Sequence, residues 1–237
     1  MTDEKHTAGE EFAKLVEIMK RLRQECPWDR KQDFDSLRQY LLEETYEVLE
    51  KLDEGQYREL EDELGDLLLQ VVFLSQVAAE EEFFGVSDVV RRIQQKLIRR
   101  HPHVFGEEKA ETAGEVVDRW ERIKTGQEKK ESRLSGVPAE LPALLKAVRM
   151  VEKIRRAGIT PFATRGPTEE AEESLEALLR GTEQGADRQA LAGRALLAVA
   201  GLLGREDINP EDALRAELDR LSELFQDIET ELAERGT

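Results

Sequence analysis

Two pairs of acidic residues break into the apolar faces of two consecutive segments with helical periodicity. The first segment repeats apolar residues at helical steps, at Leu37, Leu41, Val48 and Leu52. Glu44 occupies the missing position of this row, and Glu47 lies one turn further along the same side. The next segment places Glu63 and Asp66, spaced i, i+3, along the edge of its own apolar face. Carboxylates that face one another across a bundle repel unless protons, arginines or a metal neutralise them.

Carboxylate oxygens are the ligands that hard divalent cations prefer, and helical bundles project such side chains inward from facing helices. The pattern therefore predicts an Mg²⁺ site, with Mn²⁺ as a possible substitute, on Glu44, Glu47, Glu63 and Asp66. A di-iron site usually needs Glu-x-x-His pairs, and neither segment contains a histidine. The simpler alternative is that these acids face solvent, because the chain has 52 Asp and Glu residues. Because two acidic pairs occur on adjacent helical segments, the metal site is favoured over acids that simply face solvent.

Helices must position these acids, and the composition predicts an all-α fold. Aromatic residues make up only 5% of the 237 residues, and Glu, Leu, Arg, Lys and Ala dominate. Pro and Gly breaks delimit helices expected at 9–24, 34–54, 57–82, 86–100, 113–130, 139–157, 168–181, 187–204 and 210–234. Long helices joined by short turns indicate antiparallel bundles. The polar segment 126–138 is the best linker candidate, which predicts two helical-bundle domains, 1–130 and 131–237.

The formal net charge of −17 disfavours nucleic acids and anionic membranes as partners. No segment has the roughly 18 consecutive apolar residues of a membrane span, and the first residues lack the pattern of a signal peptide. We therefore expect a cytoplasmic protein. Cys26 is the only cysteine, so an internal disulfide is excluded, and three histidines are too few to suggest a Cys/His metal site.

The segments LEETYEVLE and ELEDELGDLLLQVVF resemble the two-part signature of the MazG family of nucleoside triphosphate pyrophosphohydrolases, Glu-Glu-x-x-Glu followed by Glu-x-x-Asp. CPWDRKQ, KLIRRHPHVFG and RWERIK match further family motifs in order and spacing, so the resemblance covers about residues 11–125. It implies metal ligands at Glu44, Glu47, Glu63 and Asp66, with Glu43 in or beside the coordination shell as a further catalytic residue. It also implies hydrolysis of a nucleoside triphosphate to the monophosphate and pyrophosphate. The implied assembly is a homodimer or larger homo-oligomer, in which dimerisation completes a four-helix-type bundle.

Candidate substrate contacts lie in the other matching motifs. They are Trp28, Asp29, Lys96, Arg99, Arg100, Trp120 and Lys124. Lysine and arginine can bind phosphate oxygens, and either tryptophan can stack on a base. Each has a structural alternative, since basic residues favour helix C-termini and tryptophans often anchor a core.

The second half of the chain resembles the first half as a degenerate repeat. Glu172, Glu173 and Glu176 repeat the first acidic motif, whereas Leu191 and Arg194 replace the second acidic pair. We therefore expect this domain to bind no catalytic metal and to serve packing, oligomerisation or regulation. Two non-enzymatic alternatives remain for the whole chain: a helical scaffold and a nucleotide-binding regulator.

Overall fold

The computed structural model describes residues 7–106, 112, 114–116, 132, 134–159, 162, 166–179 and 187–235, apart from the side chain of Glu234. Every regular element in these ranges is a helix, which confirms the all-α prediction. The chain divides into two compact units, residues 1–127 and 128–237. None of the described helices combines the length and apolar character that crossing a lipid bilayer requires.

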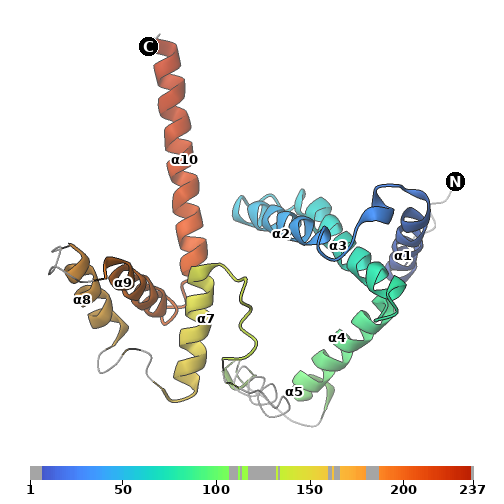
Figure 1. Cartoon of the computed structure of the whole chain (residues 1–237), viewed down its shortest axis with the longest axis horizontal. Helices are drawn as coiled ribbons and strands as arrows, with labels where there is room; N and C mark the ends of the chain where they lie inside the picture. The colour runs from blue at the N-terminus through green and yellow to red at the C-terminus, as the bar shows by residue number, and fades with distance from the viewer. Residues whose placement is uncertain are drawn as a thin grey trace. The chain divides into compact units, whose positions relative to one another are not determined.

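Unit 1 carries the acidic pairs, and Figure 1 shows its helices α1 to α5. Its elements are α1 (Ala8–Glu25), η1 (Asp29–Lys31), α2 (Leu37–Asp53), α3 (Leu60–Glu80), α4 (Val86–Arg100) and α5 (Pro102–Phe105). A capping box begins α1, because Thr7 Oγ1 accepts from the backbone N–H of Glu10 and the Glu10 carboxylate accepts from that of Thr7. A turn containing Gly55, whose φ is +68°, joins α2 to α3, so these two helices run antiparallel.

Helix boundaries agree with the sequence expectation to within a few residues wherever the structure describes them. The start and end of α4 are as expected, whereas α2 begins three residues later than expected. The one-turn elements η1 and α5 were not anticipated. The helix expected at 113–130 lies outside the described residues except for 114–116, which are helical.

The core of unit 1 lies between α1, the start of α2 and the second half of α3. Its buried members are Met19, Leu37, Val72, Phe73 and Val77. The apolar face expected on α3 is only partly buried, because α1 and α2 together cover only part of that helix. The side chains of Leu64, Leu68 and Val71 remain 48%, 41% and 39% exposed.

Arg23 joins three segments of unit 1. Its guanidinium donates to the Glu80 carboxylate at the end of α3, with Nε 3.1 Å from both carboxylate oxygens. It also donates to the backbone carbonyl oxygens of Asp29 and Gln32, the latter at 2.8 Å. The same group lies 5.7 Å from the centre of the Phe73 ring. Arg23 therefore holds the 26–32 loop against α3.

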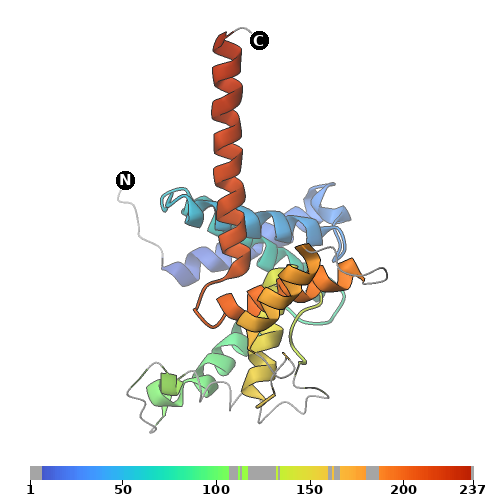
Figure 2. The same ribbon diagram turned by 90° about the vertical axis from the view of Figure 1, so that its left-hand side faces the viewer.

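Unit 2 consists of α7 (Ala143–Arg156), α8 (Pro167–Leu179), α9 (Arg188–Leu203) and α10 (Pro210–Arg235). Val151, Phe162, Ala171 and Ala198 form its buried core. Gly201 permits close packing, because a Cβ at this position would lie 2.8 Å from Phe162 Cζ. Figures 1 and 2 both show α10 extending well beyond α7, α8 and α9.

Candidate metal centre

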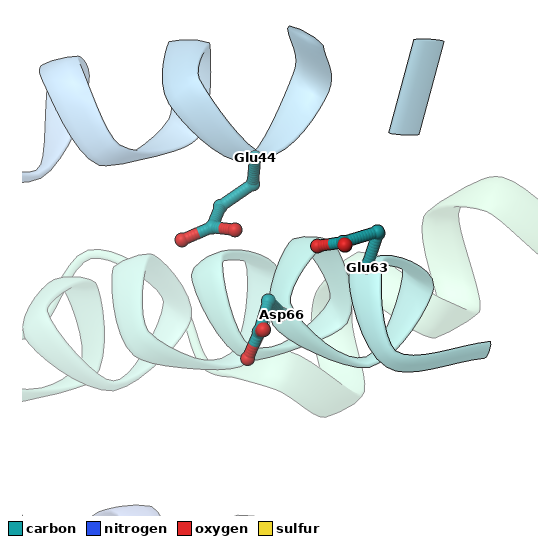
Figure 3. Close-up of side chains that lie close together, drawn as sticks. All are labelled: Glu44, Glu63 and Asp66. Carbon is teal, nitrogen blue, oxygen red and sulfur yellow. The ribbon is translucent and has the colours of Figure 1, made fainter. Parts of the chain in front are cut away.

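The antiparallel pairing of α2 and α3 brings three carboxylates together. Glu44 projects from α2 toward α3, where Glu63 and Asp66 occupy successive turns (Figure 3). One carboxylate oxygen from each residue lies within 4.8 Å of the others. Among the described residues, this is the one cluster of three or more side chains with metal-ligand potential.

Glu47 does not belong to this three-carboxylate cluster, but it lies close enough to Glu44 and Glu63 to raise the pKa of both. Partial burial raises the pKa of Glu44, and the charges of Asp66 and Glu47 raise it further. The pKa of Glu63 is also raised, first by desolvation and then by the Glu47 charge, while Lys51 opposes the rise. The ionised acids therefore repel one another across the helix pair.

Two residues beside the acids were missed by sequence reasoning. Gln70 is buried, and its side-chain amide hydrogen-bonds to the Glu44 carboxylate, while its Oε1 has no hydrogen-bond partner. On α2, Lys51 places its Nζ 3.7 Å from Glu54 and partly offsets the negative charge at Glu63. Gln70 follows Asp66 by four residues and Lys51 follows Glu47 by four. This helical spacing is the signal that could have revealed them.

This arrangement fits a hard divalent cation. Three clustered carboxylate oxygens, with Glu47 adjacent, are the donors that such an ion prefers. Burial and then the negative charge of neighbouring acids raise the pKa values of Glu44 and Glu63, and a bound cation would offset both effects. Glu43 is exposed and does not belong to the three-carboxylate cluster. Its role stays a prediction.

The described substrate contacts predicted from the sequence lie on two other parts of unit 1, the segment before α2 and helix α4. Trp28 is 51% exposed, with its ring edge-on to Tyr40 at 5.8 Å, whereas the neighbouring Asp29 is buried. On α4, Lys96 and Arg99 are exposed, whereas Arg100 is buried.

The acids occupy the first two turns of α3, and α4 begins beyond its last turn (Figure 1). Accordingly, none of the described groups that shift the pKa of Glu44 or Glu63 lies on α4. Trp120 and Lys124 lie outside the described residues.

Unit 2 shows no equivalent cluster among its described residues. Glu172, Glu173 and Glu176 are exposed on α8. Opposite the first acidic motif, α9 presents Leu191 and an exposed Arg194 instead of a second acidic pair. The expectation that this unit binds no catalytic metal stays a prediction.

Replacing Glu44 with glutamine should stabilise the metal-free protein near neutral pH. The pKa of Glu44 is raised above its ordinary value of 4.5, so ionisation of this group opposes folding as the pH rises above that value. Each like-charged helical pair costs about 0.2–0.5 kcal/mol. Two acids, Asp66 and Glu47, raise the pKa of Glu44 by their charge, so on the same scale thermal unfolding in EDTA at pH 7.5 should show a gain of about 0.4–1 kcal/mol. The gain should vanish near pH 4, where the wild-type carboxyl is protonated.

Added Mg²⁺ should reverse this order, since the wild-type protein gains stability from a bound ion and the variant gains less. Equal stabilisation of both proteins by Mg²⁺ would remove Glu44 from the metal site.

Comparisons with known proteins agree with the motif resemblance. Residues 32–105 match the model of the MazG nucleotide pyrophosphohydrolase domain, a range that contains all the clustered acids. A nucleoside triphosphate pyrophosphohydrolase of Escherichia coli K12 is 37% identical over 234 residues, covering 94% of this chain and 89% of the relative.

A nucleoside triphosphate pyrophosphohydrolase/pyrophosphatase MazG of Thermotoga maritima is 39% identical over 232 residues, covering 96% of this chain and 89% of that protein. The crystal structure of a mazG-related protein from Thermotoga maritima aligns with a TM-score of 0.43 and 27% identity, covering 48% of this chain and 98% of that one. On the sequence identity and coverage of the two full-length relatives, the chain belongs to the MazG nucleotide pyrophosphohydrolase family.

Proposed function

We propose that this protein hydrolyses nucleoside triphosphates to nucleoside monophosphates and pyrophosphate, with Mg²⁺ or Mn²⁺ as its cofactor. The observation that carries the proposal is the meeting of Glu44, Glu63 and Asp66 between α2 and α3, within the segment that matches the family. The relatives named as nucleoside triphosphate pyrophosphohydrolases support the same reaction. The expected role is cleansing or regulation of the nucleotide pool.

The carboxylates of Glu44, Glu47, Glu63 and Asp66 would hold the cation. When bound, a divalent cation neutralises charge on the phosphates and activates water for attack. Gln70 would orient Glu44 through their hydrogen bond, because its buried amide has little freedom to turn away. Glu43 is the candidate for orienting the attacking water.

The phosphates and the base need partners beyond the acids. We assign the phosphates to Lys96, Arg99 and Arg100, and the base to Trp28 or Trp120. Asp29 and Lys124 belong to the same two motifs as these tryptophans.

Because α4 begins at the opposite end of α3 from the acids, the phosphate-binding candidates on α4 are separated from the acids in one chain (Figure 1). The exposed Leu64, Leu68 and Val71 on α3 also need a partner surface. Both observations support a homo-oligomer, in which another copy covers α3. The cytoplasmic location and the absence of nucleic acid partners stay predictions.

A product assay tests the reaction. The protein is incubated with each NTP and dNTP in the presence of Mg²⁺, and the products are separated by ion-exchange chromatography. Monophosphate and pyrophosphate in equal amounts are expected from at least one substrate, and EDTA should stop their formation. Diphosphate with inorganic phosphate would contradict cleavage between the α and β phosphates. Absence of any product would favour the nucleotide-binding regulator or the scaffold.

A further inference from the structure

The last helix of unit 2 carries a continuous apolar stripe that the proposed reaction does not use. The stripe consists of Leu214, Leu218, Leu221, Phe225, Ile228 and Leu232, spaced alternately by four and three residues. Each of these side chains is between 46% and 60% exposed. Beyond Arg215, every described side chain of α10 is exposed, so α7, α8 and α9 do not cover the stripe.

The spacing of the stripe identifies the geometry of its partner. Alternating steps of four and three average 3.5 residues, which keeps one seam facing a second helix in a left-handed coiled coil. The stripe spans nearly three heptads of a helix about 39 Å long, at 1.5 Å per residue over 26 residues. A helix of this kind gains most of its stability from burying its apolar face. The occupant must therefore be a helix with a matching repeat.

We infer that α10 pairs with the α10 of a second copy of this chain in an antiparallel coiled coil. A second copy supplies the same repeat over the same length, and two-fold symmetry makes the stripe its own complement. When the two antiparallel helices are aligned so that residue 223 of each lies at the two-fold axis, the stripes of the two copies meet. Leu221 then packs against Phe225 of the second copy, Leu218 against Ile228 and Leu214 against Leu232. Each layer then joins one residue of the first half to one of the second half.

Flanking side chains favour the antiparallel orientation. Leu224 borders the stripe and is 56% exposed. In the antiparallel register it faces Leu224 of the second copy at the two-fold axis, where both are buried. In a parallel pair it would face Glu229 instead. Apolar burial at the centre thus requires the antiparallel pair.

The distribution of charge supports the same orientation. Both halves of α10 are acidic, but to different degrees. The half after Leu221 has five acids and one arginine, a net charge of −4, whereas the first half has four acids, Glu211, Asp212, Glu217 and Asp219, with Arg215 and Arg220, a net charge of −2. A parallel pair would align the two more acidic halves. The antiparallel pair separates them and brings Arg215 beside Glu229 of the second copy. It also places Glu217 opposite Glu231 at the exposed edge, where solvent and salt screen the repulsion.

Engineered disulfides in the full chain test both pairing and orientation. The native thiol is first removed by Cys26→Ser, and the variants Leu218→Cys, Ile228→Cys and the double variant are then oxidised and examined by non-reducing gel electrophoresis. Positions 218 and 228 lie about 15 Å apart along one helix, so they cannot bond within a chain. They oppose each other only between antiparallel copies.

Most of the double variant should become covalent dimer, while each single variant stays uncrosslinked. Crosslinking of the single variants to the same extent as the double variant would show a parallel pair and overturn the orientation. Absence of covalent dimer in all three would overturn the pairing, even if size-exclusion chromatography showed a dimer formed through unit 1. This outcome is independent of the product assay.

Discussion

Replacing Glu63 with glutamine should lower the turnover of nucleoside triphosphates at least about 100-fold, since even residues that only support a metal ligand contribute about 10- to 100-fold. Glutamine keeps the size of the side chain but removes the charge, and a neutral amide is a poorer ligand for a hard cation. The expected loss is in kcat, measured by pyrophosphate release at saturating Mg²⁺. Mg²⁺ should also raise the thermal unfolding temperature of this variant less than that of the wild type.

The matched control is Glu173→Gln in unit 2. It removes a carboxylate from the segment that repeats the first acidic motif. Glu173 is exposed on α8 and belongs to no cluster of potential metal ligands among the residues that the structure describes. Turnover by this variant should equal that of the wild type, and both variants should keep the helical circular dichroism spectrum. Activity of Glu63→Gln within a few-fold of wild type would contradict the proposed metal site. Lost activity in Glu173→Gln would assign unit 2 a part in the reaction.

Helix boundaries were predictable because local residues determine them. Pro27 follows the end of α1, and Pro210 starts α10, since proline is accepted in a first turn but not inside a helix. The one-turn elements η1 and α5 escaped prediction because they are too short to show a hydrophobic period. Local chemistry therefore predicted the long helices and their order.

The acidic cluster was partly predictable, because Glu44 interrupts an apolar row and the short turn at Gly55 requires antiparallel helices. The spacing of four residues from Asp66 could have placed Gln70 beside the acids, but its burial and its unpaired oxygen were not predictable from an isolated glutamine in an apolar sequence. The exposure of Leu64 and Leu68 was also not predictable from the sequence. Apolar residues are found both in the core of one chain and in an interface between copies, so their type does not distinguish the two. Only the tertiary packing distinguishes these cases.

Replacement of Arg23 is expected to cause a large loss of stability in unit 1. Its side chain is 9% exposed, and it makes charge-assisted hydrogen bonds to Glu80 as well as bonds to two backbone carbonyl oxygens. Arg23 also lowers the pKa of Glu80, which shows that the folded state favours the ionised pair. Since the pKa is lowered, this contribution is present at neutral pH and is lost as the pH falls through the folded-state pKa of Glu80.

Arg23→Ala should therefore reduce the free energy of unfolding of unit 1 by about 2–3 kcal/mol at pH 7, below the usual 3–5 kcal/mol because Glu80 is 37% exposed and solvent screens its charge. The matched control is Arg21→Ala, which breaks a solvent-exposed pair with Glu25 on the same helix and should cost at most about 0.5 kcal/mol. Urea unfolding in a Trp120→Phe background, followed by the fluorescence of Trp28 in the loop that Arg23 holds, measures both. Equal midpoints for the two variants would show that Arg23 does not anchor this loop. At pH 3 the difference between the variants should shrink but not vanish, because the bonds from Arg23 to the carbonyl oxygens of Asp29 and Gln32 do not titrate.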